Sequence, residues 1–559
     1  MTLTLATDDT PFFLAPDYVR RAGDECAFPP QVADAVQRCA ARVAADPALR
    51  ALAAARYETL YRTEPFPRAE LRDWPLLADE RHPDADLFYV LVALGGLPEM
   101  RAFFRERAIP EVVYRAGLSD VLRWMDDYRT RTSPTGAWGL APRYLGWLRH
   151  HFKGELFQLG RLQFEPGRGN VGAHFFRRRD TRRVLALSED GAVYRADGQL
   201  QGAGGVTDEA GAWTATFARD ERIVSGYPLS PYGGAIRDHV TLSLTEWDPI
   251  LSPGDSTLNV HMPAGSPMDF DQCGQSFARA LEFFPRHLPE QRFVAFICSS
   301  WLLDPQLDGP LPAQSNIVRF QRQVYLLPSP SGGGSTLERV FGSAEVDLSI
   351  APRDTTLRRA VIGIVERGGH IRSGRCAIFP EELRAGGWGG ERYRRGTLKR
   401  KAFAYVTHRD AEGERLLVFS HPEAPEAGLQ VPAGSLEEGE DPAAGALREA
   451  HEETDLPLES LELVRLLGEA LRDLRDVEKD ELHHRHFFHV RCTAQEVPER
   501  WRTYELYGSD EIEAGLPPEK RTKHLFECFW VRLPDGVPPL VSEHARFLPE
   551  LVRTRQGDD

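Results

Sequence analysis

The chain has 559 residues, of which 42% are hydrophobic, 27% charged and 10% aromatic. This is the composition of a globular protein, and it excludes a mainly disordered or collagen-like chain. The formal charge is −15 and there is no basic block, so binding to the phosphate backbone of a nucleic acid is not expected. Because one hydrophobic core rarely exceeds about 250–300 residues, the length predicts about two to four domains.

Seven cysteines are scattered along the chain without a C-x-x-C pair. This pattern indicates neither a disulfide scaffold nor a zinc ribbon, so a reducing compartment is expected and the cytoplasm is the predicted location. The first residues carry no positive charge and predict no export signal. The longest apolar run, Leu87–Leu97, is broken by two glycines and is shorter than the roughly 20 residues of a membrane span. It therefore predicts a buried helix, and no membrane partner is expected.

Residues 1–152 are predicted to form a helical domain. Apolar residues recur there at the three- and four-residue spacing of amphipathic helices. Two stripes consist of Val32, Val36, Cys39 and Val43, and of Val121, Leu122, Met125 and Tyr128. Asp120 precedes the second stripe and is expected to cap its helix, because an aspartate at that position accepts hydrogen bonds from free N–H groups.

Residues 153–390 are predicted to form an α/β domain, because the hydrophobic period changes to alternation and strands then mix with helices. An Asp-Gly turn between 183–187 and 192–194 predicts a hairpin. Further expected strands are 239–244, 258–262, 293–298 and 317–327, and the expected helices are 269–284 and 355–367. Ser329–Ser335 is predicted to be a loop.

Four phrases in this region resemble a bacterial N-acyltransferase family that has a helical N-terminal domain and a GNAT-like C-terminal domain. The phrases are Leu159–Glu165, Leu258–Gly265, Ser300–Leu307 and Ser315–Gln321. The resemblance covers most of residues 1–390 and implies transfer of an acyl group from CoA to an amine. The residues that it implies to lie near the reacting thioester are His261, Cys298, Ser300 and Asp304.

An acyl-CoA substrate needs a site for its pyrophosphate, and a helix N-terminus offers free N–H groups and the positive end of the helix dipole. The strand 258–262, the loop Pro263–Pro267 and the helix 269–284 place a glycine-containing loop at such a terminus. The predicted CoA-binding residues are Gly265, Ser266 and His261.

Two of these residues have a second interpretation. His261 is a candidate general base, or a polar residue that is satisfied at a strand end. Cys298 is expected to be a buried core thiol. The phosphate signature of GNAT domains, Arg or Gln, two residues, Gly, one residue, Gly or Ala, is missing at the expected place. It occurs at Arg384–Gly389, where it follows no strand and opens no helix, so we interpret it as a chance match.

The glycine-rich, basic segment Arg384–Arg395 is predicted to be an interdomain linker. From 396 to 559 the chain has 21 Lys and Arg against 34 Asp and Glu, a net charge of −13. This segment carries nearly all of the excess acid of the chain. Residues 396–556 are therefore predicted to form a separate domain with its own chemistry.

Carboxylates gather on one predicted helix early in this last domain. Asp441 can cap the helix, and Pro442 suits its first position. Glu449, Glu452 and Glu453 share one face at i, i+3 and i+4, where their charges repel each other. A divalent cation would neutralise them, and oxygen ligands favour Mg²⁺ or Mn²⁺ over zinc.

Three neighbouring positions support the same interpretation. Arg448 points away from the acidic face and is expected to pair with Glu440, which would pin the preceding loop to the helix. Gly434 has no side chain, so its carbonyl group can approach a metal ion closely.

The pattern resembles the Nudix hydrolase box at Gly434, Glu440, Arg448, Glu449, Ala450, Glu452, Glu453 and Leu456. It departs at Asp455, where the family usually has glycine; a left-handed residue is expected there, which aspartate tolerates better than most. Expected strands at 401–406 and 416–420 precede the box, as in the family. The resemblance covers about 399–555 and implies an α/β/α sandwich, so the whole chain is predicted to be multidomain α+β.

The resemblance implies hydrolysis of a nucleoside diphosphate linked to another moiety, with Mg²⁺ or Mn²⁺ as cofactor. The implied metal ligands are Glu449, Glu452, Glu453 and the carbonyl of Gly434. The implied catalytic residues are Glu452, Glu453, Arg448 and Glu440. The general base often lies outside the box; the candidates are Glu478, Glu481, Glu505 and Glu511, and Glu452 or Glu453 can also serve.

His483–His489 contains four histidines. On a strand, His484 and His486 would share one face. The alternatives are a plain strand, a strand that contacts substrate, and a zinc site.

Three functional hypotheses remain. The first is a Mg²⁺-dependent Nudix diphosphatase fused to an acyltransferase-like module, and the second is an acyl-CoA-dependent N-acyltransferase with an auxiliary Nudix domain. A third, a ligand sensor, predicts lost box carboxylates, and here all are present. The expected partners are a small nucleotide-type substrate and acyl-CoA.

Overall fold

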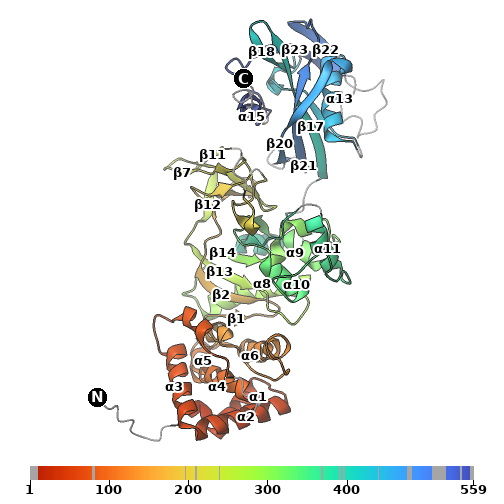
Figure 1. Ribbon diagram of the computed structural model, residues 1–559. Coiled ribbons are helices and arrows are strands. Elements are labelled where there is room, and N and C mark those ends of the chain that lie inside the picture. Colours follow the sequence, from red (N-terminus) through yellow and green to blue (C-terminus); the bar gives the residue numbers. More distant parts are fainter. Residues whose placement is uncertain are drawn as a thin grey trace, which may run out of the picture.

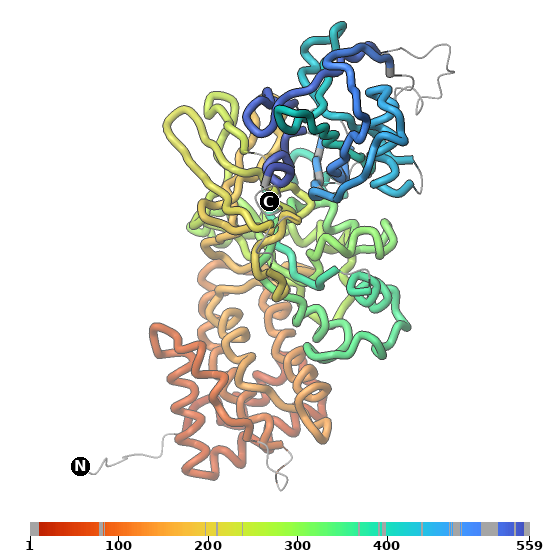
Figure 2. The backbone as a smooth tube through the Cα atoms, turned by 45° about the horizontal axis from the view of Figure 1, so that its top comes forward, coloured from red at the N-terminus to blue at the C-terminus, as the bar shows by residue number. Residues whose placement is uncertain are grey.

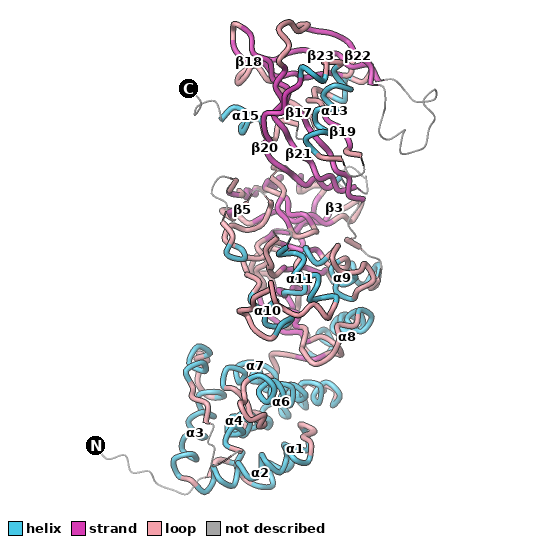
Figure 3. The backbone as a smooth tube through the Cα atoms, turned by 45° about the vertical axis from the view of Figure 1, so that its right-hand side comes forward, coloured by secondary structure: helices cyan, strands magenta, loops and turns pink. Residues whose placement is uncertain are grey.

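The computed structural model contains three units that follow one another along a long axis (Figures 1 and 2). The structure describes residues 10–553 except 78–81, 83, 196, 208–210, 238, 367–368, 390–391, 394–396, 438–439, 475–480, 506–523 and 542–543. Figure 3 shows a mostly helical unit at the N-terminal end, a mixed unit in the middle and a strand-rich unit at the C-terminal end. The predicted multidomain α+β class is confirmed.

The N-terminal unit is a helical bundle. Its helices are α1 (Pro16–Glu25), α2 (Pro30–Ala45), α3 (Pro47–Tyr61), α4 (Phe88–Leu94), α5 (Leu97–Glu106), α6 (Glu111–Arg131) and α7 (Leu145–Phe152). Proline opens the first three of them, where its fixed φ suits the helical start. The stripe predicted on α2 is confirmed, because all four of its residues are buried.

The predicted helix cap at Asp120 is wrong. Helix α6 begins at Glu111, directly after Pro110, so Asp120 lies in its middle and is 1% exposed. A buried aspartate inside a helix is tolerated here because neighbouring side chains, rather than free N–H groups, donate to it.

Helix α4 forms the centre of the bundle, and all seven of its residues are buried. The stretch Ala85–Glu106, which includes α4 and α5, is long and apolar enough to cross a membrane by length and composition, and 72% of its most apolar window is buried inside the molecule. Such burial is typical of a core helix. The buried helix predicted at Leu87–Leu97 is confirmed, and the two helices meet at Gly95 and Gly96.

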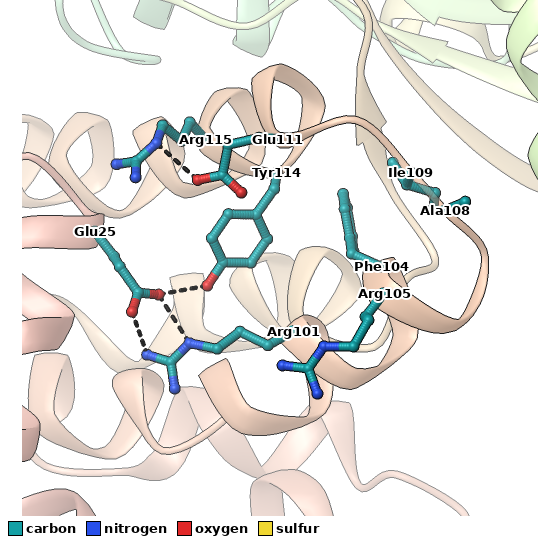
Figure 4. A pocket seen from close by; sticks show the side chains of 9 residues that line it. All are labelled: Glu25, Arg101, Phe104, Arg105, Ala108, Ile109, Glu111, Tyr114 and Arg115. Atoms are coloured by element: carbon teal, nitrogen blue, oxygen red, sulfur yellow. Dashed lines mark hydrogen bonds and ion pairs between the residues drawn. The ribbon is translucent and has the colours of Figure 1, made fainter.

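A pocket of about 500 Å³ lies among α1, α5 and α6 (Figure 4). Arg101 donates from Nε and Nη2 to the two carboxylate oxygens of Glu25, at 2.9 and 2.6 Å. The Tyr114 hydroxyl donates to the same carboxylate at 2.5 Å. This network ties three helices together, and we interpret it as structural.

We expect Tyr114→Phe to destabilise this corner of the bundle by about 1–2 kcal/mol, because a buried hydroxyl then no longer donates to a charged carboxylate. Hydrogen exchange across α1, α5 and α6 measures the local free energy of opening. Tyr504→Phe, the same change on an exposed ring, is the control. An unchanged exchange rate in α1 would contradict the interpretation.

The central unit is built on a six-stranded sheet in the order β1-β2-β13-β14-β16-β15. Strands β13 (Ser256–His261) and β14 (Ala295–Ser300) run parallel and are connected by α8 (Phe270–His287), which confirms the predicted strand–helix–strand order. The other strands are β1 (Phe157–Gln158), β2 (Gln163–Arg168), β15 (Tyr325–Leu327) and β16 (Gly374–Ile378). The remaining helices are α9 (Asn316–Gln321), α10 (Gly334–Phe341), α11 (Thr356–Glu366) and α12 (Pro380–Gly386).

A second group of strands packs against this sheet and lies between it and the C-terminal unit (Figure 1). A five-stranded sheet contains β3 (Ala173–Arg178), β4 (Val184–Ser188), β9 (Pro228–Ser230), β10 (Gly234–Ala235) and β12 (Trp247–Leu251). Two small sheets contain β5 (Val193–Tyr194) with β6 (Trp213–Thr214), and β7 (Phe217–Arg219) with β8 (Ile223–Gly226) and β11 (Val240–Ser243).

Two predicted elements of the central unit are wrong. The Asp-Gly turn exists, but β4 pairs with β3 and β9 while β5 pairs with β6, so no hairpin forms between β4 and β5. The strand predicted at 317–327 begins as helix α9, because the Ser315 side chain caps it by accepting from the N–H of Val318.

The start of the predicted linker belongs to the central unit. Helix α12 continues to Gly386, and the Trp388 indole donates to the carbonyl of Phe270 at 2.9 Å. A Cβ on Gly274 would overlap the Trp388 ring, so glycine makes room for this contact.

The C-terminal unit is a mixed sheet in the order β20-β21-β17-β18-β23-β22, with β19 paired to β17. Its strands are β17 (Thr397–Asp410), β18 (Gly413–Ser420), β19 (Ala433–Ser435), β20 (Leu461–Asp473), β21 (Glu481–Cys492), β22 (Arg500–Glu505) and β23 (His524–Arg532). Helix α13 (Pro442–Thr454) packs on one face, and Phe547 with α15 (Leu548–Arg553) packs on the other. These three layers agree with the predicted sandwich.

His544 is buried in this unit, and its Nδ1 accepts a hydrogen bond from the N–H of Val431 at 3.1 Å. Burial, followed by the charge of Arg485, lowers the pKa of His544 to about 3. In the unfolded chain this histidine is protonated below about pH 6.5, whereas in the folded chain it stays neutral down to about pH 3. The contribution of neutral His544 to the free energy of unfolding is therefore fully present above about pH 6.5 and is lost as the pH falls toward 3.

We therefore expect the free energy of opening of β17, measured by hydrogen exchange corrected for intrinsic rates, to fall by up to about 1.4 kcal/mol per pH unit below pH 6. His544→Gln, whose amide oxygen can still accept from Val431, should flatten this slope. Equal slopes in both proteins would show that another group titrates.

Candidate active sites

Helix α13 has the termini that its sequence predicts. The Asp441 side chain accepts from the N–H groups of Ala443 and Ala444, and Pro442 occupies the first turn. Asp455 ends the helix in the left-handed conformation with φ of 59°. The departure from glycine at this position therefore leaves the helix end intact, and all three expectations are confirmed.

Arg448 connects α13 to the loop before it. Its Nε donates to Glu440 at 2.9 Å and its Nη2 donates to the Ser435 carbonyl at 3.0 Å, which confirms the predicted pair with Glu440. The predicted direction of the guanidinium, away from the acidic face, is wrong. Its Nη1 lies 2.8 Å from both Glu449 and Glu452. One cation therefore contacts three carboxylates.

Glu449 is buried in this arrangement. A Cβ at Gly434 would overlap the Glu449 carboxylate, so only glycine allows the loop to pass there. Burial raises the pKa of Glu449 to about 7; Arg448 acts against the rise and the charge of Glu452 adds to it. The Glu453 carboxylate accepts from the N–H of Ala433 at 2.8 Å and so ties α13 to β19.

The donor chemistry of this cluster fits a hard divalent cation, because every donor is an oxygen and the acids outnumber the cation that contacts them. The part of the chain that the structure describes contains no group of three acidic, histidine or cysteine side chains already converging on one point. The reason is visible: Glu449 and Glu452 engage Arg448, and Glu453 engages Ala433. The metal-ligand roles stay a prediction.

Four general-base candidates lie outside the box. Glu478 and Glu511 lie outside the described residues, and of Glu505 only the backbone is described. Glu481 pairs with Lys399 at 3.0 Å and with His483 at 2.8 Å.

The histidine-rich segment forms part of β21, which confirms the predicted strand. The rings of His484 and His486 lie 4.2 Å apart, as expected for residues on one face. Within the described ranges no third metal-binding side chain joins them, so the zinc alternative is not supported there.

A second candidate site is a cavity of about 980 Å³ between the helical unit and the central unit. It is lined by α6 and α7 of the helical unit, and by β2, β13, β14, the loop that follows β13, α9, α10 and α11 of the central unit. His261 Nε2 lies 3.1 Å from Glu165 Oε2, and the His261 ring stands edge-on to Trp147 with 4.8 Å between ring centroids. A histidine with a carboxylate partner at a cavity wall is an arrangement that can accept and return a proton.

Glu165 is held as a carboxylate. Burial alone would raise its pKa, but the hydrogen bond with His261 and the charge of His150 outweigh burial and keep the pKa below its usual value. Asn259 also donates to Glu165, at 3.4 Å. Sequence analysis missed the role of Glu165, although it lies in one of the quoted phrases, because its pairing with His261 depends on the register of β2 against β13.

Asp120 holds Trp147 in place beside His261. The Asp120 carboxylate accepts from Trp147 Nε1 at 3.0 Å, from Gln163 Nε2 at 2.9 Å, and also contacts His151 Nε2 at 2.9 Å. Arg123 forms an ion pair with it as well. These partners come from both units, so the carboxylate connects them.

The other residues predicted near the thioester divide into two groups. Cys298 and Ser300 line the cavity with His261, and Cys298 is buried as expected. Asp304 does not line it: Asp304 is buried and accepts from the N–H groups of Gln306 and Arg372, so it serves as a local anchor.

The structure supports only part of the predicted phosphate site at the start of α8. Ser266 lines the cavity, and Gly265 has a φ of 98° in the loop. However, the Asp269 carboxylate accepts from the N–H of Gln272 and caps the helix. The helix terminus that was expected to receive the pyrophosphate is therefore occupied by a negative side chain.

Three family models match the chain. Residues 17–154 match the N-acyltransferase N-terminal domain, residues 156–378 match the GNAT-like C-terminal domain, and residues 398–551 match the NUDIX domain. The resemblances predicted from the sequence are confirmed. No curated protein matches the chain.

Solved structures are similar to separate parts of the chain. An acyltransferase in complex with decanoyl-CoA and teicoplanin is 24% identical, with a TM-score of 0.44, over 65% of this chain and 88% of that one. A C. elegans Ap4A hydrolase in a binary complex is 15% identical, with a TM-score of 0.20, over 28% and 98%. The NUDIX domain of Shewanella oneidensis NrtR with ADP ribose is 16% identical, with a TM-score of 0.21, over 32% and 99%.

Proposed function

We propose that the chain carries two enzymatic activities at two separate sites. The C-terminal unit is proposed to hydrolyse the phosphoanhydride of a nucleoside diphosphate linked to another moiety. The first two units are proposed to transfer an acyl group from a CoA thioester to an amine. The three matching family models support this division. For location we propose the cytoplasm, supported by seven cysteines that are all free and buried.

The observation that carries the hydrolase proposal is the contact of one guanidinium with three carboxylates on and beside α13. Glu449, Glu452, Glu453 and the Gly434 carbonyl would hold Mg²⁺ or Mn²⁺, which when bound polarises a diphosphate and acidifies water. Arg448 keeps the Glu440 loop against the helix, and Glu453 keeps the helix against β19. The carboxylates are thereby positioned before substrate arrives.

A screen of the full-length protein tests this proposal. The substrates are nucleoside diphosphate sugars, dinucleoside polyphosphates and CoA, each with Mg²⁺ or Mn²⁺ and each with EDTA. We expect cleavage of at least one compound with metal and none with EDTA. No cleavage of any compound, or cleavage that survives EDTA, would contradict the proposal.

The observation that carries the acyltransferase proposal is the pairing of His261, which lines the cavity, with Glu165. The neutral amine nitrogen attacks the thioester carbonyl carbon, so a C–N bond forms and the C–S bond breaks. His261 takes the proton that the amine loses and returns it to the sulfur of the departing CoA, while Glu165 stabilises the charged imidazole. The products are an amide and free CoA thiol.

Release of free thiol from acyl-CoA in the presence of amines tests this second activity. We expect thiol release that depends on both the acyl-CoA and the amine. Mass spectrometry should show the acyl group on the amine nitrogen. Thiol release without an amide product would indicate thioester hydrolysis and would contradict acyl transfer.

A further inference from the structure

A smaller pocket of about 230 Å³ adjoins the acyltransferase cavity and shares part of its wall. Three arginines line it from three different elements: Arg123 from α6, Arg161 from the turn before β2, and Arg279 from α8. Glutamine side chains complete the wall at positions 158, 272 and 275. No acidic residue is among the described residues that line this pocket. The pocket therefore presents amide groups and the charges of Arg161 and Arg279, while Arg123 is also paired with Asp120.

Arg161 is built into the floor of this pocket. It is 9% exposed, and its Nε and Nη2 donate to the carbonyl groups of Pro267 and Ser266, both at 2.9 Å. Its Nη1 has no hydrogen-bond partner among the described residues. A buried guanidinium nitrogen without an acceptor is costly, and an anionic ligand would satisfy it.

The other two arginines lie near Arg161 and its contacts: Arg279 is close to Gly160, which precedes Arg161, and Arg123 is close to Gly265, which precedes the Ser266 that Arg161 contacts. A Cβ on Gly160, which has a φ of 90°, would lie 2.7 Å from Arg279 Nη1, so glycine makes room for this guanidinium. A Cβ on Gly265 would lie 3.8 Å from Arg123 Nε. Burial lowers the pKa of Arg123, and the charge of Arg161 lowers it further, as expected for two cations kept near each other.

The usual place for a phosphate in this region is closed. Asp269 caps α8 and places a negative charge at its N-terminus. The glycine signature of GNAT domains is also missing at its expected place after the strand 258–262. A phosphorylated substrate that reaches His261 therefore needs its counter-charge from another group, and the arginine pocket opens next to the same cavity.

We propose that this arginine pocket binds a phosphate group of the CoA substrate. The proposal rests on the acyltransferase function proposed above and specifies how its substrate is held. Guanidinium groups suit phosphate because they donate two parallel, charge-assisted hydrogen bonds. Because Arg123 belongs to the helical unit, the bound phosphate links that unit to the central one.

Charge changes at Arg279 test the proposal, because this side chain is exposed and its replacement does not threaten the fold. The measured quantity is kcat/KM for an acyl-CoA divided by kcat/KM for the same acyl group on pantetheine, which has no phosphate. We expect this ratio to fall about 10-fold in Arg279→Gln and further in Arg279→Glu, because the first change removes charge-assisted hydrogen bonds to the phosphate and the second adds a repulsive charge. Arg286→Gln, an exposed arginine on the same helix and outside the pocket, is the control.

The outcomes are distinguishable. If the unchanged protein transfers acyl groups from CoA and the ratio is the same in all variants, phosphate is not bound in this pocket and the inference is wrong. If Arg286→Gln lowers the ratio as much as Arg279→Gln, the effect is general electrostatics and the inference is also wrong. If the unchanged protein transfers no acyl group from either thioester, the proposed acyltransferase function itself fails.

Discussion

His261→Asn is expected to lower kcat for acyl transfer by about 10²–10⁴-fold, because that is the contribution of a positioned general base. The asparagine side chain fills similar space, but it cannot take a proton from the attacking amine. KM for acyl-CoA should change little, since a phosphate group of CoA is proposed to bind in the arginine pocket and not at His261. Steady-state rates of thiol release over a range of acyl-CoA concentrations measure both parameters.

Glu165→Gln provides a second measurement of the same pair. It retains an oxygen within reach of His261 and removes the negative charge, so a smaller loss than in His261→Asn is expected. The matched control is His370→Asn, because that histidine is exposed and outside the cavity. Equal activity of His261→Asn and the unchanged protein would remove His261 from the mechanism.

Glu453→Gln is expected to lower phosphoanhydride hydrolysis by about 10²-fold or more, as when a key stabiliser of the transition state is removed. The glutamine oxygen can still accept the hydrogen bond from Ala433, so the position of α13 should be kept. What is lost is one negative charge of the set that is proposed to hold Mg²⁺ or Mn²⁺. Calorimetric titration with each ion should show weaker binding in step with the lower rate.

The control for this experiment is Glu459→Gln, an exposed glutamate in a 3₁₀ turn of the same unit. It removes the same charge from the same domain without touching the box. If Glu453→Gln and Glu459→Gln both hydrolyse at the unchanged rate, the metal role of Glu453 is wrong. A rate loss in Glu453→Gln with unchanged metal affinity would point to Glu453 as a base instead of a ligand.

The Nudix box could be predicted in detail because its information is local. Asp441, Pro442 and Asp455 set the ends of α13 within the same short segment that carries the carboxylates. Helical spacing then places the acids on one face without knowledge of the rest of the fold. The direction of the Arg448 side chain was the part of the box that the sequence did not predict. A long side chain can fold back onto acids one and four residues away on the same helix.

The candidate acyltransferase site could be predicted only in part, because its residues meet through tertiary structure. His261 and Glu165 are brought together by the pairing of β13 with β2, whose register no local pattern specifies. The predicted helix cap at Asp120 failed for the same reason. The local sequence favours a cap, whereas the fold surrounds the carboxylate with donors from α7 and β2. Helix α9 was mistaken for a strand because its apolar residues are too few to show a period.

The carboxylate of Asp120 has a consequence for how this protein can be rearranged. Its donors Trp147 and Gln163 belong to different units, so pulling the units apart would leave a buried charge short of partners. Neither half of the cavity is then self-sufficient. A protein engineer who exchanges modules in this architecture would have to transfer the helical bundle and the adjoining six-stranded sheet together.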